Sequence, residues 1–240
     1  MKKSDSNVDR VYAKLRQLAA NFEFKPDARI NESALSSELG ASRTPLREAL
    51  NRLVAEGFLT FQSGRGFFCR SLSPILVLDL YEARVAIETE TVRLACRRAS
   101  DNDLTALRVY LDQNELVYCA DSDPKHLLDQ DEAFHMKIAH LSGNDELVRI
   151  LNNLNDRVRY IRLIYLNSQM AKTVDFNGEK TKTSAHRVIL EALIARDENA
   201  ATATMRQHIE RRREDAAKTV RIAYSQLYVP DDEFLMEGRH

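Results

Sequence analysis

The sequence predicts a mainly α-helical protein with two domains: a small head that contains one β-hairpin, and a bundle of six antiparallel helices. Apolar residues recur at three- and four-residue spacing along most of the 240 residues, which is the periodicity of an amphipathic helix. Strand-favouring residues cluster only around a glycine-rich link near residue 64. A Ser-Leu-Ser-Pro segment ending at Pro74 separates the two regions. We therefore place the head in residues 1–72, the bundle in residues 73–229 and a flexible tail in residues 230–240.

The head is expected to contain three helices before the hairpin. The first runs from Val8 to about Phe22. The next two lie within the segment Asn31–Glu56 and are joined by a tight turn at Gly40-Ala41. The last of the three has an apolar stripe at helical spacing, formed by Leu46, Ala49, Leu50 and Leu53. Two short helices with this turn indicate a helix-turn-helix.

Four polar residues lie near the N-terminus of this last helix and away from its stripe: Ser42, Arg43, Thr44 and Arg47. Ser42 is also placed to cap the helix, and Pro45 is tolerated in the first turn because its missing N–H costs little there. In a helix-turn-helix, this end of the second helix meets bases and phosphates in the major groove of DNA. We therefore predict that these four residues contact DNA.

The β-hairpin pairs the segment 58–61 with the segment 67–69. Its link contains Gly64, Arg65 and Gly66, so the backbone can approach a phosphate closely beside a cation. We predict that Gly64 and Arg65 contact DNA as a wing. The alternative is an ordinary helical hairpin beside an unrelated β-hairpin. The wing, the basic helix end and the spacing together favour DNA binding.

The segment INESALSSELGASRTPLREALNRLVAEGFL resembles the DNA-binding signature of the GntR family of bacterial transcription regulators. The resemblance implies a winged helix-turn-helix that binds palindromic operator DNA as a homodimer. It also implies that Arg43, Thr44, Arg47 and the wing contact the DNA. The sequence departs from the family pattern at Asp27, where the family has glycine, and at Ser33, where some members carry an arginine.

The composition agrees with a DNA-binding head on a body that avoids DNA. The net charge is −1, yet residues 1–72 hold 12 Lys and Arg against 8 Asp and Glu, and the remainder is acidic. The three cysteines show no metal-ligand spacing and indicate free thiols in a reducing compartment. No leader follows Met1, and no apolar run approaches the roughly 18 residues of a membrane span. These features predict a cytoplasmic protein without a membrane partner.

The second domain shows amphipathic helical segments separated by short polar breaks, and no convincing strand. The expected helices cover residues 75–98, 101–120, 124–142, 144–167, 180–196 and 197–225. Residues 169–178 are the least regular connection. Six helices of this kind are expected to form an antiparallel bundle around one core.

Polar residues interrupt three of the apolar stripes in this bundle. Asp131 and His135 lie one turn apart on the third helix, while His186 begins the stripe of the fifth helix and His208 lies on the apolar side of the sixth. A single buried imidazole usually needs only a hydrogen-bond partner. Three imidazoles and one carboxylate facing the same interior instead predict a site for a divalent metal ion such as zinc, nickel or manganese.

The segments DEAFHMKIAHLSGND and AHRVILEALIARDENAATATMRQHI resemble the FCD sensor domain, a helical ligand-binding domain found behind GntR-type heads. The number of sensor helices is similar to that of the VanR-type subgroup. In metal-binding members the ligands are an Asp, a His four residues later and two further His on later helices. The resemblance therefore assigns the metal to Asp131, His135, His186 and His208.

The same resemblance assigns an effector contact to Arg84. In this family an arginine on the first sensor helix often faces the cavity, and LYEARVAIETE matches that helix. Arg84 would bind the carboxylate of a small organic acid, whose other oxygens would complete the metal shell. The alternative is that Arg84 only forms an ion pair with Glu88, four residues later.

The predicted function is that of a metabolite-responsive transcription regulator, a repressor as in most of the family. The effector would bias the placement of two DNA-reading heads. A second hypothesis makes the metal itself the signal, or only a structural element. A third is a metal-dependent hydrolase, for which Glu132 is the only nearby candidate base and faces another side of its helix.

Overall fold

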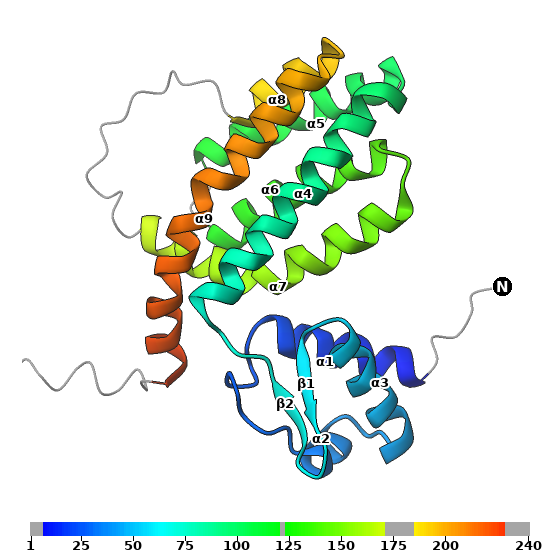
Figure 1. Cartoon of the computed structure of the whole chain (residues 1–240), viewed down its shortest axis with the longest axis vertical. Coiled ribbons are helices and arrows are strands. Elements are labelled where there is room, and N and C mark those ends of the chain that lie inside the picture. The colour runs from blue at the N-terminus through cyan, green and yellow to red at the C-terminus, as the bar shows by residue number, and fades with distance from the viewer. Residues whose placement is uncertain (1–6, 121–122, 171–184, 229–240) are drawn as a thin grey trace, which may run out of the picture. The chain divides into compact units, whose positions relative to one another are not determined.

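A computed structural model describes residues 7–120, 123–170 and 185–228 (Figure 1). The chain divides into two compact units, one formed by the residues up to Ser73 with the end of the chain from Gln226, the other by Pro74–Ser225. Within the described ranges, no helix is both long and apolar enough to cross a membrane. The predicted tail, residues 230–240, lies outside the described residues.

The first unit has the predicted order of three helices and a hairpin. Its elements are α1 (Asn7–Ala20), α2 (Glu32–Glu38), α3 (Arg43–Ala55), β1 (Leu59–Gln62) and β2 (Gly66–Cys69). The strands pair antiparallel, with Leu59 opposite Cys69 and Gln62 opposite Gly66. Helix α3 packs against both α1 and β1 (Figure 1). The shared core contains Val11, Leu15, Leu46, Leu50, Leu53 and Phe58, none of which is exposed. The winged helix-turn-helix is therefore confirmed.

The turn between α2 and α3 depends on Gly40, whose φ of +56° is a conformation that favours glycine. Asn31 caps α2, because its side-chain oxygen accepts a hydrogen bond from the N–H of Ala34 at 3.0 Å. Ser42 occupies the cap position of α3 with extended backbone, but its side chain makes no capping hydrogen bond. Its hydroxyl is therefore not used by the helix that it precedes.

The second unit is all helical, as predicted. The described residues form α4 (Pro74–Arg98), α5 (Asp101–Ala120), α6 (Pro124–Leu141), α7 (Asp145–Met170), α8 (Ala185–Ile194) and α9 (Glu198–Tyr228). The predicted boundaries agree within one residue for α4, α5 and α6, and the predicted end of the fifth helix lies two residues beyond that of α8. The ends differ for α7 and α9, which both continue three residues further. Residues 171–184, which hold most of the predicted irregular connection and the expected start of the fifth helix, lie outside the described residues.

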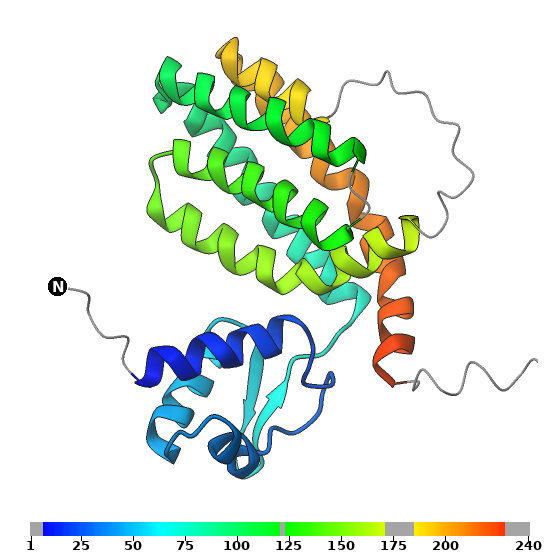
Figure 2. The same ribbon diagram turned by 180° about the vertical axis from the view of Figure 1, so that it is seen from behind.

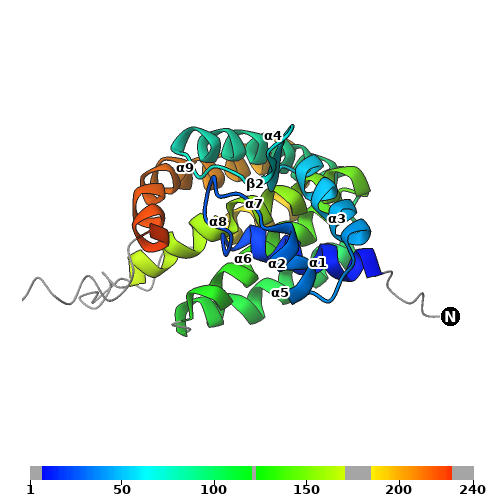
Figure 3. The same ribbon diagram turned by 90° about the horizontal axis from the view of Figure 1, so that it is seen from below.

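Helices α4, α6 and α7 pack against one another, and α5 packs against α6 and α8 (Figure 2). Helix α9 lies beside α4 (Figure 3) and runs in the opposite direction (Figure 1). Ion pairs join these two helices at both ends, Arg97 with Glu198 and Arg213 with Glu82. This arrangement brings the inward faces of α4, α6, α8 and α9 to one region of the bundle.

Candidate DNA-binding surface and candidate metal centre

The predicted DNA contacts of α3 are exposed side chains near its N-terminus, namely Ser42, Arg43, Thr44 and Arg47. Beside them is a hollow of about 580 Å³, lined by Arg29, Ile30, Asn31, Glu32, Ser33, Arg43 and Arg47. Nη1 of Arg47 lies 3.5 Å from a carboxylate oxygen of Glu32, and its guanidinium lies over the ring of Phe67. The hollow is therefore basic, with one carboxylate that orients Arg47.

The wing places Gly64 and Arg65 at the exposed tip of the hairpin. Gly64 has a φ of +73°, and the N–H of Arg65 donates to the carbonyl of Gln62 at 3.0 Å. The guanidinium of Arg65 lies over the ring of Phe68, 5.3 Å from its centroid. The tip is therefore a tight turn in which the guanidinium of Arg65 packs on the ring of Phe68.

Arg29 belongs to this surface, although the sequence analysis did not assign it a role. The chain around it pairs with β2, because the N–H of Ile30 donates to Phe67 and the N–H of Cys69 donates to Ala28. A side chain at Gly66 would meet the guanidinium of Arg29 at 3.9 Å. The pairing is a single bridge, so no strand periodicity could reveal it. The sequence did offer one sign of this role, because Arg29 is a cation two residues before Asn31, the residue that caps α2.

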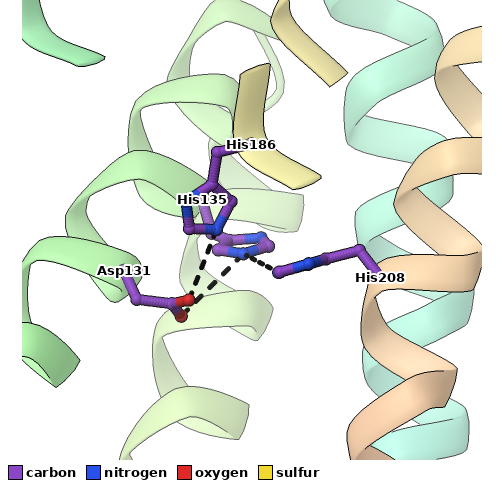
Figure 4. A group of neighbouring side chains, drawn as sticks. All are labelled: Asp131, His135, His186 and His208. Carbon is purple, nitrogen blue, oxygen red and sulfur yellow. Dashed lines mark hydrogen bonds and ion pairs between the residues drawn. The ribbon is translucent and has the colours of Figure 1, made fainter. Parts of the chain in front are cut away.

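The four predicted metal ligands come together inside the second unit (Figure 4). Asp131 and His135 lie on α6, His186 on α8 and His208 on α9, and their potential ligand atoms lie within 4.8 Å of one another. Nε2 of His135 is 3.1 Å from Nε2 of His208 and 3.9 Å from Asp131, while Nε2 of His186 is 3.3 Å from Asp131. Three helices thus converge on one cluster of nitrogen and oxygen donors.

This cluster suits a divalent metal ion. Donors in a tetrahedral zinc site are about 3.3 Å apart, close to the separations observed here. Burial lowers the pKa of His186 and of His208, so both rings stay in the neutral form that binds metal. Burial alone would raise the pKa of Asp131, but the charge of Arg162 and the contact with His186 hold it well below its ordinary value. The carboxylate is therefore ionised.

Glu88 on α4 contacts the side of His135 that faces away from the other three donors. Its carboxylate contacts Nδ1 of His135, which leaves Nε2 of that ring facing the other donors. Arg84 reaches Glu88 through Nε at 2.9 Å and Nη2 at 2.7 Å, and all three side chains are buried. Burial would raise the pKa of Glu88, but Arg84 and His135 together lower it to about 2. Arg84 thus adopts the ion pair that the sequence offered as the alternative to effector binding.

Arg162 on α7 is a further buried cation that the sequence analysis missed. It contacts Asp131, and its Nη1 lies 3.3 Å from Glu132. Arg159 contacts Glu132 as well. Burial raises the pKa of Glu132 despite these two cations. The sequence could have indicated that Arg162 is buried, because it lies at helical spacing from Leu151 and Val158 on the buried face of α7.

Comparisons with known proteins agree with both halves of the molecule. Residues 7–69 match the family model described as bacterial regulatory proteins of the gntR family, and residues 79–211 match the FCD domain. The chain is 35% identical to the Nta operon transcriptional regulator of Aminobacter aminovorans, over 92% of this chain and 100% of that protein. It is 31% identical to the HTH-type transcriptional repressor GlaR of Escherichia coli, over 78% and 84% respectively.

A solved structure described as E. coli McbR/YncC shares the fold, with a TM-score of 0.62 and 21% identity over 93% of this chain and 97% of that chain. A GntR regulator from Rhodococcus gives a TM-score of 0.60 at 21% identity, over 91% and 99% respectively. The curated relatives named above are transcription regulators rather than enzymes. The two matched models account for both units, and the chain belongs to the GntR family of bacterial regulators, with an FCD domain behind its DNA-binding domain.

Proposed function

We propose that this protein is a repressor that binds a palindromic operator as a homodimer and responds to a small carboxylate through a metal ion in its FCD domain. The observation that carries this proposal is the cluster of Asp131, His135, His186 and His208, four donors inside a domain joined to a DNA-binding head. A regulator that needed no ligand would have little reason to gather three imidazoles and a carboxylate at one point.

On the DNA side, the exposed N-terminus of α3 enters the major groove. Arg43, Thr44 and Arg47 contact base edges and phosphates there, with Ser42 at the first phosphate. Gly64 and Arg65 of the wing contact the backbone beside the groove. We add Arg29 to this set, because it shares the basic hollow with Arg43 and Arg47.

On the sensor side, the four donors would hold a divalent ion such as zinc, nickel or manganese. Four protein ligands leave further positions open if the ion is five- or six-coordinate, and carboxylate oxygens of a metabolite can fill them. The assignment of Arg84 to this metabolite stays a prediction. Both of its contacting nitrogens now face Glu88, so a ligand carboxylate would have to share or displace that partner.

The effector can act only if it binds one arrangement of the two heads better than another. Helix α4 begins at Pro74, directly after the DNA-binding unit, and carries the Glu88 that contacts His135. A change in the coordination of the metal ion could therefore reach α4, the helix that follows the DNA-binding unit, through the single contact between His135 and Glu88. The names of two relatives, a regulator of the Nta operon and the repressor GlaR, agree with control of an operon by repression.

The alternative that the metal itself is the signal, or only a structural element, differs in one outcome. In that case chelation alone would abolish operator binding or unfold the sensor domain, and no carboxylate would change the response. The hydrolase hypothesis loses its candidate base, because Glu132 is held by Arg159 and Arg162.

The test measures metal content and operator binding on the same untagged preparations. We expect about one metal ion per chain in wild type and less than a tenth of that in His135→Ala and His208→Ala. His140→Ala is the matched control, because His140 is an exposed histidine on the same helix. Mobility shifts with operator DNA should weaken when small carboxylates are added to the metal-loaded protein only. Wild type that takes up none of the three metals would overturn the metal centre.

A further inference from the structure

Three guanidinium groups surround the candidate metal centre, and two of them are already paired. Arg84 is held by Glu88, and Arg162 is held by Asp131 and Glu132. The third, Arg212, lies on α9 one turn after His208. It is half-buried, and within the part of the chain that the structure describes its guanidinium forms no hydrogen bond or ion pair. Arg212 is thus a cation next to the cluster without a described counterion.

Arg212 faces a small cavity beside the cluster. The cavity has a volume of about 10 Å³ and is lined by Tyr81, Arg162, Tyr165, Leu166, Arg212 and Ala216. This volume holds about one water molecule. Burial is the main cause of the lowered pKa of His208, and the charge of Arg212 contributes to it. Arg162 lines the same cavity and contacts Asp131, so the cavity lies one side chain away from the cluster.

With a divalent ion bound, the charges around the cluster would leave a positive excess that an anion would neutralise. Glu88 offsets Arg84, Asp131 offsets Arg162, and Arg159 is paired with Asp129 and Glu132. Asp215, an acid about one turn later on the same helix, lies near Lys218 and 3.5 Å from the hydroxyl of Tyr165. A divalent ion at the four donors would add two positive charges to that of Arg212. Uncompensated charge away from water is costly, so a ligand with more than one negative charge is favoured.

We propose that Arg212 binds a second carboxylate of the effector, so that the sensor domain selects small di- and tricarboxylates over monocarboxylates. The inference rests on the proposed metal centre, since the first carboxylate would bind the ion. Four residues along a helix span about 6 Å, which a short dicarboxylate can bridge. Because the cavity as it stands has a volume of only about 10 Å³, this binding would require the long side chain of Arg212 to rotate toward the ligand. A fork-shaped guanidinium is suited to this task because it pairs with both oxygens of a carboxylate.

The test is calorimetric titration of the zinc-loaded full-length protein with citrate, succinate and acetate. For wild type, we expect citrate or succinate to bind at least about tenfold more tightly than acetate. Arg212→Gln should lose that preference while keeping the zinc content and the acetate affinity of wild type. Arg211→Gln is the matched control, because Arg211 is the exposed neighbour on α9. Arg212→Lys keeps the charge and should retain only part of the preference, which separates recognition from a fault in folding.

The outcomes distinguish this inference from the proposed function. Zinc bound to wild type with no preference for citrate or succinate, or a preference that survives in Arg212→Gln, overturns the role of Arg212 and leaves the metal centre intact. Wild type that binds no zinc, nickel or manganese overturns both. Equal loss in Arg211→Gln and Arg212→Gln also contradicts the inference, because it would reflect the overall charge of α9.

Discussion

The surroundings of Glu88 explain how a carboxylate remains charged inside the helical bundle. Arg84 supplies the opposite charge from one turn away, and His135 supplies a ring nitrogen from another helix. Removing one member of such a buried set leaves the others unpaired. The stability of the pair and the orientation of His135 are therefore coupled, and Glu88 would act as a positioning residue for the proposed metal ion.

Replacing Glu88 with glutamine is expected to lower the metal affinity by about 10- to 100-fold, because the ring of His135 loses the charge that orients it. Competition with a chelating dye measures this affinity. Glu90→Gln is the control, since Glu90 lies on the same helix, is partly exposed and pairs with Arg93. An unchanged affinity in Glu88→Gln, with the fold intact by circular dichroism, would show that His135 needs no such support.

At the scale of elements, the short pairing beside β2 contributes to the proposed DNA-binding surface. It holds Arg29 next to the wing and opposite the N-terminus of α3. Arg29 lines the same hollow as Ser33, where some family members carry an arginine. The element is only one bridge long, yet it adds one positive charge to the hollow.

Replacing Arg29 with alanine should weaken operator binding by about tenfold and reduce the slope of log affinity against log salt by about one. The physical reason is the loss of one phosphate or base contact. Titration by fluorescence anisotropy at several salt concentrations measures both quantities. Lys14→Ala removes an exposed cation of α1 and is expected to leave the slope unchanged. If both variants behave alike, Arg29 has no contact of its own.

The same scale shows what the sequence could and could not predict. Helical periodicity located the helices, and the stripes of α6, α8 and α9 placed four donors on inward faces, because those patterns are local. The pairing of Arg162 with Asp131 was out of reach, since it depends on the rotation of α7 against α6. Ser42 occupies the predicted cap position, but its side chain makes no capping hydrogen bond. The sequence predicts which residue precedes the helix, but it does not fix the rotamer that a capping hydrogen bond requires.

At the scale of the whole molecule, a metal ion that binds only the folded sensor domain should stabilise that domain by mass action. At a free metal concentration 100 times its dissociation constant, this amounts to about 2.7 kcal/mol. Treatment with a chelator is therefore expected to lower the temperature at which the FCD domain unfolds, by several degrees, and to leave the unfolding of the DNA-binding domain unchanged. Differential scanning calorimetry measures both transitions. A chelator that shifts neither would argue against a resident ion.

The contact between Glu88 and His135 has a consequence for protein engineering. A hybrid biosensor that joins this sensing module to a foreign DNA reader needs a junction that keeps α4 with its own bundle. A splice at Ser73 keeps Glu88 and His135 in one parental sequence, whereas a splice after Arg98 would leave the imidazole with an unrelated neighbour. The transferable cassette therefore begins at Pro74.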